Sequence, residues 1–180
     1  IKPLSNLYTR INDTEKAIHL LEKTILSTQN VDERAALNNN LANAYLYNNQ
    51  IEKATLILEE NIEKTTNTKF KALLYNSLAS IYYEKKEYSN SIKYNKLART
   101  FFEKDSLRGD TLLWYIGALG LHTQLQQDLS STQKALRIIN INFPNTQHRL
   151  NAKLIAIEGN ILQAANDPNV IEHYNRIITF

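Results

Sequence analysis

The sequence contains one pair of residues with the spacing of a nucleophile and its base, Ser131 and Lys134. In a Ser-x-x-Lys motif, the lysine one helical turn away can take the proton of the hydroxyl group. The companion motifs of such enzymes are absent, and Ser130 and Ser131 stand where a helix is expected to begin. Serine at such a place usually caps the helix, so a capping role is favoured over a catalytic one.

The other residue types that could form a catalytic or metal-binding site are absent or dispersed along the sequence. Cysteine is absent, which excludes disulfides and thiolate metal sites. No histidine pair has metal-ligand spacing, and no glycine-rich phosphate loop occurs. Asn12 begins a glycosylation acceptor, although Asn and Asp are also expected in the turn predicted there. We therefore expect no metal, no cofactor and no catalytic centre. An α-helical enzyme is a remote alternative, which a cluster of titratable groups around His122 or His148 would support.

The bulk composition is that of a globular protein. Of the 180 residues, 43% are hydrophobic and 22% are charged, which is enough for a core and argues against disorder. No apolar run is long enough to cross a bilayer, so no membrane insertion is expected. The 21 basic residues are interleaved with 18 acidic ones, so no nucleic-acid partner is expected either. Because the chain starts at Ile1 and contains no Met, we expect it to be a segment of a longer protein.

A repeat of 37 residues organises the first part of the chain. The pattern Leu-small-x-x-Tyr begins at Leu4, Leu41 and Leu78, each 37 residues after the last. Thirteen residues after each leading Leu comes a small residue, namely Ala17, Ala54 and Ser91. The most regular copy, residues 78–98, predicts a helix, a short polar turn and a second helix that packs against the first.

The rest of the chain continues this plan less regularly. Residues 106–125 and 129–141 predict a degenerate fourth pair, in which Gly117 and Gly120 suggest a close packing contact or a kink. Two more helices are expected after Pro144. The sequence thus predicts an all-α single domain of ten helices in five antiparallel pairs, with repeats at about residues 1–30, 31–66, 67–104, 105–143 and 144–180.

These residues resemble the tetratricopeptide repeat (TPR) family, clearly over residues 1–103 and weakly beyond. The third copy matches at Leu78, Ala79, Tyr82, Ser91 and Ala98. Its period of 37 is longer than the 34 residues of the family. The resemblance implies a right-handed α-solenoid whose concave face is lined by the first helix of each pair and binds a protein or an extended peptide.

Amide and aromatic side chains are frequent on these first helices. Because an amide group both donates and accepts hydrogen bonds, a row of Asn can hold a peptide backbone irrespective of its sequence. The chain is rich in Asn throughout, so composition alone is the alternative explanation, and a single Trp in a helix is more often a core residue. The predicted groove residues are Asn6, Asn39, Asn40, Asn43, Tyr47, Asn76, Ser80, Tyr83 and Trp114.

One subfamily of TPR proteins clamps the acidic C-terminal tail of chaperones. Lys2, Asn6 and Asn40 match part of that clamp, but Leu73 and Ser77 stand where its basic pair would be, so the clamp is incomplete.

The preferred function is a non-catalytic scaffold that binds a protein or peptide. The alternative is a ligand-sensing or peptide-sensing regulatory domain of a larger signalling protein or transcription regulator, similar to those of bacteria. The C-terminal helices are expected to cap the stack, and the alternatives are contact with a partner or with another copy of the chain. The compartment is not readable from the sequence.

Overall fold

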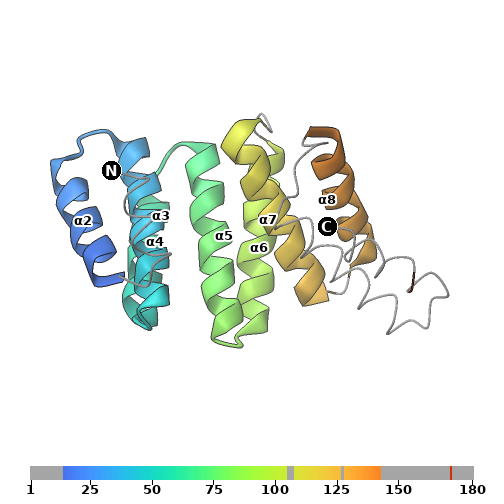
Figure 1. The fold of residues 1–180 in the computed structure, drawn as a ribbon, viewed down its shortest axis with the longest axis horizontal. Coiled ribbons are helices and arrows are strands. Elements are labelled where there is room, and N and C mark those ends of the chain that lie inside the picture. The colour runs from blue at the N-terminus through green and yellow to red at the C-terminus, as the bar shows by residue number, and fades with distance from the viewer. Residues whose placement is uncertain (1–13, 105–107, 127, 143–170, 172–180) are drawn as a thin grey trace. The chain divides into compact units, whose positions relative to one another are not determined.

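A computed structural model describes residues 14–104, 108–126, 128–142 and 171. Within these residues the chain forms seven α-helices and no strand, which confirms the predicted all-α class (Figure 1). The helices are α2 (Thr14–Ser27), α3 (Val31–Tyr47), α4 (Ile51–Lys64), α5 (Thr68–Glu84), α6 (Tyr88–Glu103), α7 (Gly109–Gln126) and α8 (Leu129–Asn142). The helices predicted before Thr14 and after Asn142, with Lys2, Asn6 and Asn12, lie outside the described residues.

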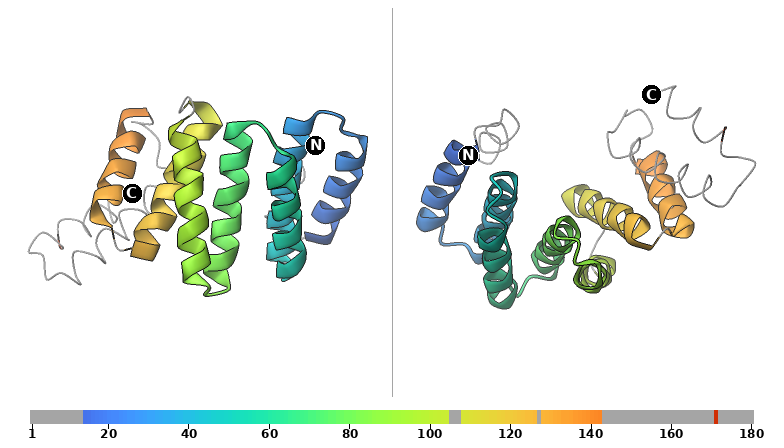
Figure 2. Two further views of the ribbon diagram at one scale, coloured as in Figure 1. Left: turned by 180° about the vertical axis from the view of Figure 1, so that it is seen from behind. Right: turned by 90° about the horizontal axis from the view of Figure 1, so that it is seen from below.

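The chain divides into two compact units, Ile1–Leu107 and Arg108–Phe180. The first unit contains α2 to α6, which stand side by side and alternate in direction (Figures 1 and 2). Short connections join these helices, which favours antiparallel neighbours. As a result, α3 and α5 run in the same direction, and α4 and α6 run against them. That the whole chain is one repeat domain stays a prediction.

Two asparagines 37 residues apart cap the N-termini of α3 and α5. The side-chain oxygen of Asn30 accepts a hydrogen bond from the backbone N–H of Glu33 at 3.0 Å. The oxygen of Asn67 accepts from Lys69 and Phe70 at 3.1 and 3.4 Å. These contacts satisfy backbone donors that have no partner within the helix. Asn67 also donates to Asp32 at 2.9 Å, so the start of α5 is tied to the first turn of α3.

The turns inside the two helix pairs have the same geometry. Asn49 ends the turn between α3 and α4 with φ at 57°, and Lys86 occupies the equivalent place between α5 and α6 with φ at 61°. In each turn the next N–H bonds back five residues, from Gln50 to Tyr45 and from Glu87 to Tyr82. This is the Schellman arrangement, which satisfies the last carbonyls of a helix.

The core of the first unit lies at the positions that the repeat predicts. Leu78 and Ala79 are fully buried, as are the small residues Ala17, Ala54 and Ser91. The hydroxyl of Ser91 donates to the carbonyl of Ala79 at 2.7 Å, so a serine can replace alanine at this close contact without leaving a polar group unpaired. The predicted role of the small residue is confirmed.

The second unit contains the described helices α7 and α8. Ile116, Leu119 and Ala135 are buried, at the places that the degenerate repeat predicts. The sequence suggested a close packing contact or a kink at Gly117. The close contact is wrong, because a Cβ atom built there meets nothing within 4 Å in the described part of the structure, and the kink stays a prediction.

Candidate functional site

One buried hydrogen bond fixes how α3 and α5 face each other. The hydroxyl of Ser77 on α5 donates to the side-chain oxygen of Asn39 on α3 at 2.6 Å. Asn39 is 5% exposed and Ser77 is 9% exposed. Asn39, one of the predicted groove residues, is therefore occupied by a contact between repeats, and its surroundings leave little of it for a partner.

The other predicted amides lie on one side of this contact. Each residue turns the helix by about 100°, so Asn40 and Asn43 lie on the same side of Asn39 along α3. Asn76 and Ser80 are turned the opposite way from Ser77 along α5. The two helices are parallel and face each other at Asn39 and Ser77. Rotations of opposite sense about their two axes therefore bring side chains to the same side of the plane that contains both axes. The remaining sides of α3 and α5 carry the buried residues that pack against α4 and α6.

Asn76 holds an acceptor without a partner. Its side-chain oxygen is buried and has no hydrogen bond within the described residues. Asn40 and Asn43 are half-buried, and no hydrogen bond engages their amide groups in the same part of the chain. The hydroxyl of Ser80 donates to the carbonyl of Asn76 at 3.2 Å, which leaves its lone pairs available. This surface, formed by Asn40, Asn43, Asn76 and Ser80, is called the amide surface below.

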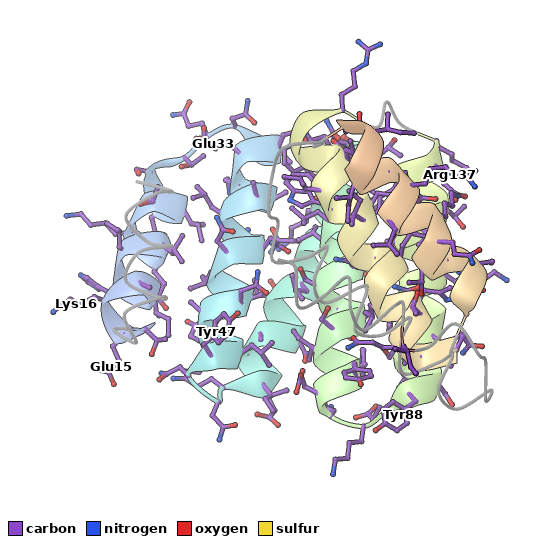
Figure 3. The ribbon with its side chains drawn as sticks, turned by 45° about the vertical axis from the view of Figure 1, so that its right-hand side comes forward. Glu15, Lys16, Glu33, Tyr47, Tyr88 and Arg137 are labelled. Carbon is purple, nitrogen blue, oxygen red and sulfur yellow. The ribbon has the colours of Figure 1, made fainter. Side chains whose placement is uncertain are left out.

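Aromatic rings stand at one end of these helices. Tyr47, at the end of α3, is 71% exposed, and Tyr88 starts α6 with half of its side chain exposed (Figure 3). The ring of Tyr83 lies 5.8 Å from that of Tyr88, in a tilted pair. Tyr47 and Tyr83 therefore extend the two rows of the amide surface with area suited to an interface.

The structure does not test the two remaining predicted residues against this surface. Trp114 lies on α7 in the second unit, where its side chain is half-buried. Asn6 falls outside the described residues. Both therefore stay sequence predictions.

The Ser-x-x-Lys pair has other partners. The hydroxyl of Ser131 donates to a carboxylate oxygen of Asp128 at 2.6 Å, and Lys134 donates to the hydroxyl of Tyr115 at 2.6 Å. The second oxygen of Asp128 accepts from the backbone N–H of Ser130 at 3.0 Å, so Asp128 caps α8 and the serines support it. The sequence prediction gave this role to the serines, and an aspartate directly before the helix was the signal it missed.

His122 lies in the same cluster, next to the capping aspartate. Its Nε2 lies 3.3 Å from the oxygen of Asp128 that accepts from Ser131. Hydrogen bonds from Ser131, outweighing the effect of burial, lower the pKa of Asp128 to about 2. A nucleophilic serine would give its proton to a base, whereas here the hydroxyl proton is held by a carboxylate that stays ionised.

Metal-binding clusters and membrane-spanning helices are both absent from the part of the chain that the structure describes. Among the described residues, no group of three or more His, Asp or Glu side chains is placed to hold a metal ion. None of the described helices combines the length and apolarity needed to cross a membrane.

Comparison with known proteins supports the repeat fold through similar structures, whereas the sequence comparisons found no match. No protein-family model matches the chain, and no curated protein does. The TPR-like repeats of a putative kinesin light chain from Podosopora anserina match at a TM-score of 0.67 and 18% identity, over 98% of this chain and 91% of that one. A single-residue variant of that protein matches at a TM-score of 0.68.

A third structure is BtubC (BKLC) from P. vanneervenii, with a TM-score of 0.70 and 17% identity over 98% of this chain and 76% of that one. The chain thus has a TPR-like helical-repeat fold, which confirms the predicted resemblance at the level of the fold.

Proposed function

We propose that this chain is a non-catalytic scaffold that binds an extended segment of a partner protein along the amide surface of α3 and α5. The buried, unpaired side-chain oxygen of Asn76 is the observation that carries the proposal. A buried acceptor without a donor costs free energy, typically about 1–3 kcal/mol. Because the Asn76 side chain as a whole is only half-buried, a turn of its amide group would bring the oxygen to a ligand N–H. The hydrogen bond formed there would remove this cost, which favours the bound state.

A peptide backbone supplies the matching groups. Each of its residues offers one N–H and one C=O, and an Asn amide can meet both. Asn40 and Asn43 stand one turn apart on α3, facing the same side as Asn76 and Ser80 on α5. Binding through the backbone would leave the choice of partner to side chains that contact Tyr47 and Tyr83.

The energetics separate this surface from the core. Removal of the Asn76 side chain deletes an unpaired polar group and introduces a better helix former, so the free energy of unfolding should stay the same or rise. Removal of Asn39, whose oxygen accepts from Ser77, should lower it. An amide kept for binding and an amide kept for folding thus respond in opposite directions.

The test begins with peptides selected on the purified wild-type chain from a random library. The double variant Asn43→Ala/Asn76→Ala should weaken their binding about tenfold or more. The matched control, Asn90→Ala/Asn142→Ala, removes two amides that lie outside the amide surface and should leave binding within about twofold. Equal binding to wild type and to the Asn43/Asn76 variant would refute the assignment, as would loss of folding in that variant.

A further inference from the structure

Four aromatic rings form a continuous stack between α5 and α6. The rings of Tyr82 and Tyr94 lie 5.3 Å apart and are nearly parallel, with 8° between their planes. Tyr94 lies 6.1 Å from Tyr75, and Tyr75 lies 5.7 Å from Phe101. All four side chains are partly exposed. The chain therefore presents a strip of aromatic surface to solvent along one helix pair, called the aromatic strip below.

Lysines flank this strip. The Nζ of Lys93 lies 5.3 Å from the centre of the Tyr94 ring, and that of Lys104 lies 5.7 Å from the centre of the Phe101 ring. Neither lysine has an ion pair within the described residues. Lys85 lies over Tyr82 at 5.4 Å but also pairs with Glu87 at 2.8 Å. Toward the Phe101 end the strip is therefore basic.

The preceding repeat shows that the fold does not require this strip. Of the four rings, only Tyr82 has an aromatic equivalent 37 residues earlier, Tyr45. In place of Tyr75 stands Asn38, which donates to Asn61 at 2.6 Å and is 7% exposed. The other equivalents are Ile57 for Tyr94, Lys64 for Phe101, Leu56 for Lys93 and Asn67 for Lys104. Helices α3 and α4 pack without the extra rings and lysines. Tyr75, Tyr82 and Tyr94 also pack against the core of the first unit, which accounts for their buried parts. The exposed parts of the rings and the flanking lysines call for another reason.

We propose that the aromatic strip binds an acidic segment of a partner protein. Tyrosine rings supply large contact area at a low cost in side-chain entropy, which is why they are frequent at the centres of interfaces. No hydrogen bond holds the hydroxyls of Tyr75 and Tyr94 in the described part of the chain, so both can donate to a partner. Lys93 and Lys104 complement carboxylates, and the proposal is independent of the amide surface.

A single-stranded nucleic acid is the rival occupant, because it also binds aromatic rings lined by lysines. One feature of the strip favours a protein. The inner rings, Tyr94 and Tyr75, each have an aromatic neighbour on either side, whereas a nucleobase needs an open face.

The experiment uses a labelled random copolymer of glutamate and tyrosine as the acidic probe and oligothymidylate as the rival probe. Wild-type chain should bind the copolymer, more weakly as salt rises. The charge reversal Lys93→Glu/Lys104→Glu should weaken this binding about tenfold, as should Tyr94→Ile, which installs the residue of the preceding repeat.

The matched control is Lys23→Glu/Lys53→Glu. It makes the same charge change, and Lys53 lies over Tyr45 at 5.4 Å, the ring equivalent to Tyr82 but without the stack. Copolymer binding to this control should stay within about twofold of wild type. An equal loss in control and test variants, no binding to wild type, or tighter binding of oligothymidylate than of the copolymer would each overturn the proposal.

Discussion

Tyr45 donates a hydrogen bond of 2.6 Å to the carboxylate of Glu22, and 37 residues later Tyr82 donates to Glu59 at 3.3 Å. Each bond joins the first helix of one pair to the second helix of the pair before it. The tyrosine of the repeat pattern is therefore a link between successive pairs as well as a packing residue.

The stronger of these links should be that of Tyr45, whose side chain is 7% exposed. We expect Tyr45→Phe to lower the free energy of unfolding by about 0.5–1.5 kcal/mol, because a hydrogen bond of a buried tyrosine is lost while the exposed carboxylate of Glu22 is hydrated instead. Tyr82→Phe, with a longer and more exposed bond, should cost less. Urea unfolding of both variants measures the difference, and equal effects would contradict the distinction.

The same bond predicts a response to alkaline pH. Burial, with Glu22 beside it, raises the pKa of Tyr45 from 10.0 to about 12. A raised pKa means that the folded state holds the proton more tightly than the unfolded state, so this stabilisation is complete below about pH 10 and is lost as pH rises through about 12. Tyr45→Phe should therefore show a shallower loss of stability over this range in urea titrations. An identical pH profile would contradict the role of Tyr45.

Ser77 and Ser80, one turn apart on α5, make a matched pair. Ser77→Ala leaves the oxygen of Asn39 buried without its donor and should cost about 1–3 kcal/mol. Ser80→Ala loses only a bond to the carbonyl of its own helix at Asn76, and should change the free energy of unfolding by less than about 0.5 kcal/mol. Thermal unfolding checks both, and similar costs would argue against the bond between α3 and α5.

Lys86 occupies a left-handed turn position where a side chain is strained, with φ at 61°. Lys86→Gly should raise the free energy of unfolding by about 0.5–1 kcal/mol, because glycine adopts this conformation without the clash of a Cβ atom. Asn49→Gly is the control, and it should be nearly neutral because Asn tolerates positive φ. A destabilised Lys86→Gly variant would contradict the strain.

Asp128 predicts a response to acid in the second unit. Its pKa, lowered from 3.8 to about 2 chiefly by the hydrogen bond from Ser131, means that the carboxylate stabilises the folded state above about pH 3.8 and loses this effect as pH falls through about 2. Asp128→Ala should cost about 1 kcal/mol at neutral pH, through loss of the cap. The cost should shrink toward pH 2 in urea unfolding, and a cost independent of pH would contradict it.

The helix pairs and their core could be predicted because the information is local and repeated. The leading Leu residues, the small residues thirteen positions later and the period of 37 follow from helical periodicity, which any copy of the repeat displays. The capping role expected before α8 was right in kind, but the residue was Asp128, since a cap depends on the φ and ψ angles of one residue at a boundary that sequence reads poorly.

Which amides are available to a partner could not be predicted from the sequence, because it depends on the side chain that each amide contacts on the neighbouring helix. Asn39, Asn40 and Asn43 look alike in the sequence, yet Asn39 is held by Ser77 on α5, while its neighbours face away from α4 and α6. The aromatic strip joins Tyr75 and Tyr82 to Tyr94 and Phe101 on another helix, and only a comparison of the repeat copies would have singled these residues out. The sequence determined the helices and which of their positions are apolar and buried. The tertiary structure decided which polar groups are already paired, because pairing depends on the register of neighbouring helices.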